Sequence, residues 1–375
     1  MKLKIGFPYF FHAYHAYHSA PIGFELSRLD TDLEIKFITT TKECNDLLNK
    51  IGSHYQEHRC SIHLLPSRFS DYFQRFAHRQ IPSPGRMIKR HARKFKSMDV
   101  IIDTNFLSLR LKQYNPDNTA KYILTNHGAG DRDREFPMHL KQIDFFLLYG
   151  PKKFRRLNGM GYLGKDNWGY IGYPKFDILL NEKKVGTELF QARRPIVLYN
   201  PHFEHHLTSW FDWGKDILDY FALSKQYNLI FAPHVELKGR SNPSLSLKKY
   251  AKIPNIHIDL GSHSSIDMSY TKMADLYIGD VSSQIVEYLV HPRPCVFLNN
   301  HKISWKDNSH YIHWKLGHVV DQISQLDNTI QDSFRSHKQF HSTQVEYFND
   351  SIQLTDTPSG LRAAQVILNF LKRMA

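Results

Sequence analysis

Short apolar runs alternate along the chain with longer segments in which apolar residues recur at helical spacing. This alternation is typical of βα units, in which helices connect the parallel strands of a sheet. In the first half of the chain, strands are predicted over 3–7, 33–38, 99–103, 121–125 and 145–149, and a helix over 20–29. In the second half, strands are predicted over 196–199, 229–232, 256–259, 274–278 and 295–298, and helices over 212–224, 284–289 and 361–374.

Two successive βα series predict an α/β protein with two Rossmann-like domains, each built on a parallel sheet. The connecting segment, 173–194, is highly charged and has weak apolar periodicity, which is typical of a domain boundary. We place the N-terminal domain at residues 1–175 and the C-terminal domain at 176–359. The amphipathic C-terminal helix, 360–375, is expected to pack back on the N-terminal domain.

The composition is that of a globular protein. Hydrophobic residues make up 41% of the chain and charged residues 23%, which excludes a largely disordered protein. The cysteines, Cys44, Cys60 and Cys295, form no Cys-x-x-Cys pair and favour a reducing compartment. The N-terminal segment lacks the continuous apolar stretch of a signal peptide, and no apolar run is long enough to span a bilayer. We therefore expect a cytoplasmic protein.

The net charge of +13 favours polyanionic partners, such as nucleotides, anionic lipid headgroups, phosphate-rich polymers or nucleic acid. No zinc finger, RRM or similar signature is present, so no nucleic acid partner is expected. Residues 86–96 form a basic amphipathic pattern, with Ile88, Ala92 and Phe95 opposite the basic face. Such a helix either lies on an anionic membrane or presents a solvated face, and its basic residues are Arg86, Lys89, Arg90, Arg93, Lys94 and Lys96.

Polar residues and glycines follow several predicted strands at their carboxyl ends, the edge where open α/β sheets bind ligands. His127 follows the predicted strand 121–125 and precedes Gly128, so the backbone can turn tightly there and approach a ligand. A histidine at this edge is a candidate general base near neutral pH. His234 follows Pro233 after another strand and is a candidate hydrogen-bond donor to a phosphate oxygen. The alternative for His127 is an incidental position in a turn, and the alternative for His234 is a position in a surface loop.

A third site of this kind is Asp280-Val281-Ser282-Ser283, between the predicted strand 274–278 and the predicted helix 284–289. Two serines beside the free N–H groups of a helix start form an anion site, by geometry and by the helix dipole. The alternative is simple N-capping, because Ser and Asp are favoured helix caps.

The loop after the first predicted strand is rich in histidine. His12, His15 and His18 recur at every third position, a spacing that could mimic metal ligands. No carboxylate or cysteine completes a metal site around them, so we expect no metal ion, and no motif indicates a bound cofactor. We interpret this loop as part of an acceptor-binding site, with His15 and His18 as the acceptor-binding residues.

The order of these motifs resembles the CDP-glycerol glycerophosphotransferases, the family of teichoic acid glycerophosphate primases and polymerases. The likeness extends over residues 125–298, whereas the first 120 residues match loosely. The matching segments are Asn126-His127-Gly128, Gly172-Tyr173-Pro174-Lys175-Phe176-Asp177, Leu198-Tyr199-Asn200-Pro201-His202-Phe203, Pro233-His234 and Asp275-Leu276-Tyr277-Ile278-Gly279-Asp280-Val281-Ser282-Ser283. The chain departs from the family pattern at His202, Ala232, Val235, Gly279 and Val281.

The resemblance implies a GT-B fold, in which two Rossmann-like domains with parallel sheets face each other across a cleft that holds the active site. The N-terminal domain would bind the acceptor, and the C-terminal domain would bind the nucleotide donor. His127 would be the general base on the acceptor hydroxyl, and His234 would bind or neutralise the donor diphosphate. The residues implied to hold the donor nucleotide and phosphate are Ser282, Ser283, Asp280, Glu287, Gly128 and His202.

The expected reaction is transfer of glycerol phosphate, or a related polyol phosphate, from a CDP-activated donor to a hydroxyl of a cell-surface polymer or lipid-linked acceptor, with release of CMP. One alternative is a GT-B glycosyltransferase that uses a nucleotide-sugar in capsule or lipopolysaccharide synthesis, because the same histidines and phosphate site would serve it. Another is a basic protein that binds nucleic acid or an anionic membrane without turnover. The resemblance implies a bacterial protein, and the membrane interpretation of residues 86–96 would place it at the inner face of the cell membrane.

Overall fold

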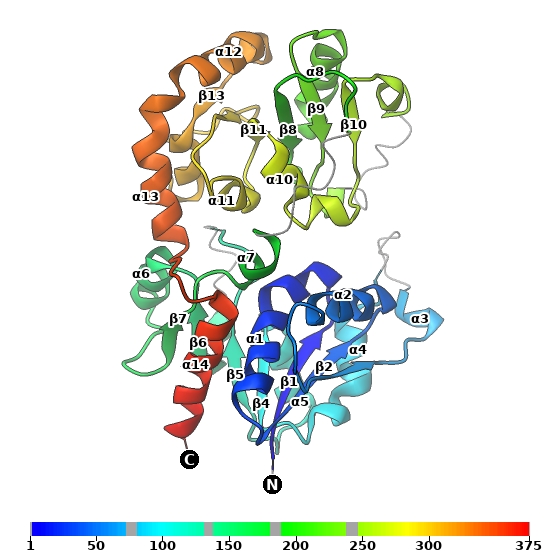
Figure 1. Cartoon of the computed structure of the whole chain (residues 1–375), viewed down its shortest axis with the longest axis vertical. Coiled ribbons are helices and arrows are strands. Elements are labelled where there is room, and N and C mark those ends of the chain that lie inside the picture. The colour runs from blue at the N-terminus through cyan, green and yellow to red at the C-terminus, as the bar shows by residue number, and fades with distance from the viewer. Residues whose placement is uncertain (1, 73–80, 131–137, 181–188, 238–246, 375) are drawn as a thin grey trace. The chain divides into compact units, whose positions relative to one another are not determined.

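A computed structural model of the chain describes residues 2–72, 81–130, 138–180, 189–237 and 247–374. The chain forms two compact units, each with its own parallel sheet (Figure 1). Unit 1 comprises Met1–Ala129, Phe136–Glu182 and Asn349–Ala375, and unit 2 comprises Gly130–Glu135 and Lys183–Phe348. Residues 181–188 of the connecting segment predicted from the sequence lie outside the described residues.

Unit 1 contains a seven-stranded sheet in which every adjacent pair of strands is parallel. The strand order is β3-β2-β1-β4-β5-β6-β7, so the direction of strand addition reverses between β1 and β4. Ligands of open α/β sheets bind outside the carboxyl ends of the strands at such a reversal. The strands are β1 (Leu3–Tyr9), β2 (Leu33–Thr39), β3 (Ser61–Leu64), β4 (Val100–Asp103), β5 (Lys121–Leu124), β6 (Phe145–Leu148) and β7 (Trp168–Tyr170).

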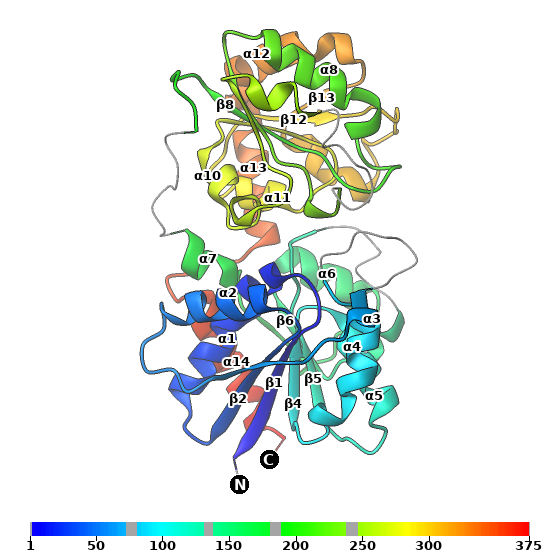
Figure 2. The ribbon, with the colours of Figure 1, turned by 90° about the vertical axis from the view of Figure 1, so that its right-hand side faces the viewer.

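Helices cover both faces of this sheet, with α1, α2 and α14 on one face and α4 and α5 on the other (Figures 1 and 2). The strands are therefore buried on both sides, which explains why they read as apolar runs in the sequence. The α-helices are α1 (Ala16–Leu29), α2 (Lys42–Gly52), α3 (Phe69–Tyr72), α4 (Pro84–His91), α5 (Arg110–Tyr114), α6 (Pro151–Gly159), α7 (Pro174–Leu179) and α14 (Ser359–Lys372). The 3-10 helices are η1 (Ala13–His15), η2 (Ala92–Phe95), η3 (Phe106–Leu109) and η5 (Met138–Gln142).

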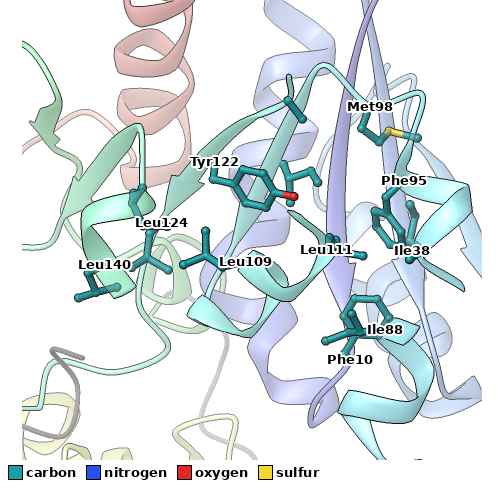
Figure 3. Packing of buried hydrophobic residues seen from close by; sticks show 14 of the residues in the cluster. Phe10, Ile38, Ile88, Phe95, Met98, Leu109, Leu111, Tyr122, Leu124 and Leu140 are labelled. Atoms are coloured by element: carbon teal, nitrogen blue, oxygen red, sulfur yellow. The ribbon is translucent and has the colours of Figure 1, made fainter. Parts of the chain in front are cut away.

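The core on the α4–α5 face is a buried apolar cluster, shown in Figure 3. Ile88 and Phe95, from the basic segment, pack there with Ile38 and Leu111. The apolar side of the basic segment thus faces the core, as its periodicity predicted. The helix itself is shorter than the predicted span, because α4 ends at His91 and the 3-10 helix η2 continues the chain.

Unit 2 contains a six-stranded parallel sheet of order β10-β9-β8-β11-β12-β13, which reverses between β8 and β11. Its apolar core packs against α8 and α12. The strands are β8 (Ile196–Asn200), β9 (Asn228–Phe231), β10 (Ile256–Ile258), β11 (Leu276–Gly279), β12 (Cys295–Leu298) and β13 (His318–Val320). The α-helices are α8 (Trp210–Leu223), α10 (Ser269–Met273), α11 (Gln284–Tyr288), α12 (Leu326–Ser336) and α13 (His341–Ser351), which ends in unit 1. The 3-10 helices are η6 (Val235–Leu237), η7 (Tyr250–Lys252), η8 (His263–Ser265), η9 (Ser309–Leu316), η10 (Ile323–Gln325) and η11 (His337–Phe340).

Every strand predicted from the sequence is present, with its ends within two residues of the predicted ones. The α/β class with two parallel sheets is therefore confirmed. The predicted helix 20–29 begins four residues earlier, at Ala16, because η1 leads directly into α1. Sequence reasoning missed β3, β7 and β13, which lie at the edges of their sheets.

The segment Gly172–Asp177 fastens α14 to the rest of unit 1. Both carboxylate oxygens of Asp177 accept main-chain N–H groups at the start of α14, from Ser359 at 2.8 Å and from Gly360 at 2.6 Å. The N–H of Tyr173 donates to the hydroxyl of Ser359 at 2.9 Å. Gly172 has φ +74°, and a β-carbon there would lie 2.6 Å from the same hydroxyl oxygen, so only glycine fits.

Among the described residues, no helix combines the length and the apolar character needed to cross a bilayer.

Candidate functional site

His127 follows β5 at the carboxyl edge of the unit 1 sheet, and its side chain is exposed. Its Nδ1 lies 3.1 Å from the main-chain oxygen of Thr104, the residue that follows β4. Because a carbonyl oxygen only accepts hydrogen bonds, Nδ1 must carry the proton and donate it. The neutral ring then keeps its lone pair on Nε2, which is the tautomer that a base acting through Nε2 requires.

His15 lies beside His127 in the same unit. The two rings are stacked, with centroids 4.4 Å apart and an interplanar angle of 21°. The Nδ1 of His15 is also 2.7 Å from the hydroxyl oxygen of Thr104. His15 is buried, and burial lowers its pKa well below the ordinary value, with repulsion from His127, His12 and His18 acting in the same direction. His15 is therefore a neutral ring beneath the exposed His127.

His18 lies on α1 and is also buried, with its ring edge-on to Tyr173 at a centroid distance of 5.1 Å. Its Nδ1 has no hydrogen-bond partner among the residues that the structure describes. Burial lowers the pKa of His18 well below the ordinary value, and the nearby charges of Lys175 and His127 lower it further. His15 stacks on His127, and His18 is near enough to interact with it electrostatically, but of the three only His127 is exposed. The acceptor-binding role of His15 and His18 stays a prediction.

In unit 2, His234 follows β9, and His202 follows β8, the strand beside it. The Nδ1 of His234 accepts the main-chain N–H of Glu236 at 3.2 Å, and the Nδ1 of His202 accepts that of Glu204 at 3.0 Å. Because Nδ1 is the acceptor in both rings, Nε2 carries the proton and is a donor. The ring centroids are 5.7 Å apart, so two N–H donors are held together at this edge.

Asp280 is buried and follows β11, the strand that pairs with β8 on the side opposite to β9. Its Oδ2 accepts the main-chain N–H of His202 at 2.9 Å and that of Ser209 at 3.1 Å. Its main-chain oxygen accepts the ring N–H groups of His313, at 3.1 Å, and Trp314, at 2.9 Å. Burial raises the pKa of its carboxyl to about 7. These contacts tie the loop after β11 to the loop after β8 and to η9.

Ser282 and Ser283 follow Asp280 and are partly exposed. The hydroxyl of Ser282 accepts the N–H of Gln284 at 3.3 Å, while the side chain of Ser283 makes no capping bond to α11. The helix α11 spans Gln284–Tyr288, too short for a strong macrodipole, so the hydroxyls are the stronger feature of this turn. Glu287 is buried within α11, and Gly128 is half-buried beside His127.

The turn after β10 is a part of this edge that sequence reasoning missed. Asp259 there accepts the N–H of Gly261 at 2.9 Å, the N–H of Ser262 at 2.7 Å and the hydroxyl of Tyr270 at 2.7 Å. The same loop is tied to the start of α11, because the side-chain amide of Gln284 donates to the main-chain oxygen of Ser265 at 3.4 Å. The sequence signal that could have revealed this turn is the Asp-x-Gly-Ser pattern of residues 259–262, at the end of the predicted strand 256–259.

One departure from the family pattern has a structural cause. A β-carbon at Gly279 would lie 2.6 Å from the phenol oxygen of Tyr277. That hydroxyl donates to the side-chain oxygen of Asn200 at 3.2 Å, and the amide of Asn200 donates to the main-chain oxygen of Ala232 at 2.6 Å. This chain therefore excludes a larger residue at 279 while Tyr277 keeps this position.

Groups of His, Cys, Asp and Glu that could hold a metal ion are absent from the described part of the chain.

No protein-family model matches the chain, and no curated protein matches it by sequence. Solved structures match it along nearly its whole length. The wall teichoic acid polymerase TagF, as a variant soaked with CDPG, matches with a TM-score of 0.63 at 15% identity over 99% of this chain and 89% of that chain. The UDP-GlcNAc 2-epimerase from Neisseria meningitidis, bound to UDP-GlcNAc, matches with a TM-score of 0.57 at 13% identity over 100% of both chains.

The glycotransferase of kitacinnamycin matches with a TM-score of 0.57 at 10% identity over 98% of this chain and 99% of that chain. At these identities the likeness is one of fold. The resemblance found in the motifs is confirmed at that level, because the TagF polymerase has the same fold as this chain. The fold is also shared with the epimerase bound to UDP-GlcNAc and with a glycotransferase, so fold alone does not select a donor.

Proposed function

We propose that the protein transfers glycerol phosphate, or a related polyol phosphate, from a CDP-activated donor to a hydroxyl of a cell-surface polymer or lipid-linked acceptor. This proposal rests on one observation: the strand-end histidine of unit 1 has the opposite tautomer to the two strand-end histidines of unit 2. His127 donates through Nδ1 and keeps a basic Nε2. His234 and His202 accept at Nδ1 and donate through Nε2. A base for the acceptor and hydrogen-bond donors for a leaving phosphate are the two functions that phosphoryl transfer needs.

In the proposed reaction, the acceptor oxygen attacks the phosphorus that bears the polyol. The proton of the acceptor hydroxyl passes to Nε2 of His127 as the new P–O bond forms. The bond from this phosphorus to the bridging oxygen breaks, and CMP leaves with the electron pair. The Nε2–H groups of His234 and His202 stabilise the charge that develops on CMP, together with the hydroxyls of Ser282 and Ser283. Positioning and electrostatics suffice for such a transfer, without a covalent intermediate.

The other residues carried over from the resemblance have supporting roles in this proposal. Asp280 and its hydrogen bonds hold the backbone of the His202 and Ser282 turns. Gly128 lets the chain turn beside the base, and Glu287, which is buried within α11, is assigned to the nucleotide side by the resemblance alone. His15 and His18 belong to the acceptor side, in unit 1. Neither a metal ion nor a cofactor is assigned a step.

Transfer of a sugar from a nucleotide-sugar is the second candidate. It is favoured by the fold matches to the UDP-GlcNAc-bound epimerase and to the glycotransferase. The same base would take the acceptor proton, but the bond that breaks would be the one between the anomeric carbon of the sugar and the phosphate oxygen of the nucleotide. A nucleoside diphosphate, or CMP from a CMP-sugar, would then leave in place of a CMP formed from a CDP-polyol.

A donor screen separates the two reactions. The protein is incubated with CDP-glycerol, CDP-ribitol, UDP-GlcNAc and a CMP-sugar, with and without a teichoic acid or saccharide acceptor, and both products are identified by mass spectrometry. The proposal requires CMP release from a CDP-polyol and an acceptor heavier by one polyol phosphate. Release of UDP, or an acceptor heavier by one sugar, supports the second candidate and contradicts the first. Salt-sensitive binding without turnover of any donor would support the basic binding protein.

We also propose that α4 and η2 hold the protein on an anionic membrane at the inner face of the cell membrane. Arg86, Lys89, Arg93 and Lys94 are exposed there, whereas Arg90 is paired with the buried Asp71. The guanidinium of Arg86 contacts the main-chain oxygen of Ser70, next to Phe69, whose side chain is 80% exposed. Exposed cations beside an exposed aromatic ring are the features of an interfacial surface. The residues concerned lie in unit 1.

Vesicle sedimentation tests this surface. The wild type should bind vesicles that contain phosphatidylglycerol and not vesicles of phosphatidylcholine alone. The double variant Lys89→Glu/Arg93→Glu should lose that binding. The control variant Lys302→Glu/Lys306→Glu makes the same change of charge at exposed lysines of unit 2 and should keep it. An equal loss of vesicle binding in both double variants would show that net charge alone causes it, and would contradict a defined membrane-binding surface.

A further inference from the structure

Thr104 bonds two histidines with two different atoms. It is the first residue after β4 and is buried. Its main-chain oxygen accepts the Nδ1–H of His127 at 3.1 Å, and its hydroxyl is hydrogen-bonded to Nδ1 of His15 at 2.7 Å. The two imidazoles bonded in this way are stacked on each other at 4.4 Å. Thr104 lies at the strand reversal between β1 and β4, where the sheet topology directs ligands.

We propose that Thr104 is a positioning residue for His127, and that it acts both directly, through its carbonyl, and through its hydroxyl, which fixes the stacked ring of His15. This inference rests on the proposed role of His127 as the base. It assigns His15 a supporting function: its ring is a platform for the base rather than a group that touches the acceptor.

The need for such a platform follows from the exposure of His127. An exposed imidazole turns readily about its side-chain bonds, and each turned state takes Nε2 away from the acceptor hydroxyl. The hydrogen bond to the carbonyl fixes one edge of the ring, but this bond by itself does not set the tilt of the ring plane. The stacked face of His15 restrains that tilt, because tilting would break the ring contact.

His15 can serve as a platform only if its own ring is held. Besides its stacking on His127, the ring is nearly parallel to that of Phe11, with centroids 5.7 Å apart and an interplanar angle of 11°. Stacking alone permits the ring to rotate within its plane, and the hydroxyl of Thr104 prevents this. Burial keeps the pKa of His15 low, so this ring carries no charge that would oppose the imidazolium formed when His127 takes a proton.

Valine and serine at position 104 separate the two parts of Thr104. Thr104→Val keeps the shape and the main-chain carbonyl but loses the hydroxyl, whereas Thr104→Ser keeps the hydroxyl and loses a methyl group. We expect Thr104→Val to lower kcat about 10-fold with the donor KM within about twofold of wild type, and Thr104→Ser to stay within about twofold in both. A purely structural role would instead make the serine variant, with its cavity, at least as defective as the valine variant.

A double-mutant cycle tests the part played by His15. His15→Phe keeps an aromatic ring in the stack but cannot bond the hydroxyl of Thr104. If the two residues act as one unit, Thr104→Val/His15→Phe should be no slower than the slower single variant. Additive losses would overturn the coupling, and wild-type kcat in Thr104→Val would overturn the proposal.

Nuclear magnetic resonance gives a readout that does not depend on turnover. Stacking on His15 should shift the ring carbon-bound protons of His127 upfield in the wild type. The shift should move toward the free-histidine value in Thr104→Val and remain in Thr104→Ser. Unchanged shifts in Thr104→Val would refute the positioning role even if no donor were turned over. Changed shifts in a protein that turns over no donor would keep this inference and contradict the proposed function instead.

Discussion

The indole N–H of Trp314 donates to the main-chain oxygen of Asp280 at 2.9 Å. Both residues are buried in unit 2, and Asp280 directly precedes the turn that carries Ser282 and Ser283. The 3-10 helix η9, which contains Trp314, thus fixes the backbone at the start of the proposed phosphate-binding turn. The sequence does not reveal this hydrogen bond, because its acceptor is a main-chain atom of a residue that lies 34 positions from Trp314.

Replacing Trp314 with Phe removes this N–H and keeps an aromatic ring in the core. A hydrogen bond is worth about 0.5–1.5 kcal/mol, so we expect the KM for the donor to rise about 2- to 10-fold. Steady-state kinetics with varied donor measure the change. The control is Trp305→Phe, at a half-buried tryptophan of unit 2 whose ring centroid is 6.0 Å from that of Trp314. An equal effect in both variants would indicate a general loss of packing.

His127→Asn tests the base. The asparagine amide can still donate to the carbonyl of Thr104, but it has no basic nitrogen in place of Nε2. General base catalysis contributes about 10²–10⁴-fold, so kcat should fall at least about 100-fold while the KM for the donor changes little. The matched control is His63→Asn, at an exposed histidine in β3 of the same unit. Substantial activity in His127→Asn would exclude His127 as the base.

His234 is expected to act as a donor, which a glutamine can imitate and an alanine cannot. His234→Ala should lower kcat/KM about 10- to 100-fold, because a donor to a charged leaving group is lost. His234→Gln carries an amide N–H that can reach toward the same phosphate and should recover part of this loss. Initial rates of CMP release measure both variants. If the glutamine variant is as poor as the alanine variant, the ring is needed for something other than donation.

The pH dependence of stability should carry the signature of the buried histidine His18. Its pKa in the folded protein is lowered, mainly by burial, so the unfolded chain takes up a proton near pH 6.5 when the folded one does not. The unfolded state therefore binds more protons below that pH, and stability falls as the pH drops, with a slope of at most about 1.4 kcal/mol per pH unit for one proton. Above about pH 6.5 this contribution is constant.

His18→Gln removes the titrating group, so the drop in the urea midpoint between about pH 7.5 and about pH 5.5 should be smaller than in wild type. The control is again an exposed histidine, as His63→Gln, which should keep the wild-type difference. The comparison within each variant cancels any loss of packing that the substitution itself causes. An unchanged difference in His18→Gln would mean that His18 is protonated in the folded protein.

The sheets could be predicted from the sequence because strands buried on both faces leave apolar runs that need no tertiary information. Edge strands are different. The four residues of β3 are partly or fully exposed, and β7 contains Gly169, so neither strand forms a distinct apolar run. The early start of α1 was missed because His15 and His18 read as polar, although both are buried.

The candidate site could be predicted only in part. His127 and His234 were found because they follow apolar strands directly, and strand ends gather at one edge of a sheet. Their tautomers depend on the carbonyl of Thr104 and the N–H of Glu236, and backbone groups leave no mark in a residue pattern. The stacking of His15 on His127 could not be predicted either, because it joins residues 112 positions apart through the β1–β4 reversal.

The segment Gly172–Asp177, which carries part of the family resemblance, leads to a prediction about the stability of the protein. Asp177 caps α14 with both carboxylate oxygens, although it lies far from that helix in the sequence. Loss of a helix cap costs about 0.5–2 kcal/mol, so Asp177→Ala should lower the urea midpoint and expose the C-terminal helix to proteases. Asp177→Asn keeps one side-chain oxygen as acceptor and should lose about half as much. Donor KM should not change in either variant, because these contacts lie within unit 1 and the proposed donor residues His202, His234, Ser282 and Ser283 lie in unit 2. A variant that lost donor binding while keeping its stability would assign Asp177 to the site rather than to the helix.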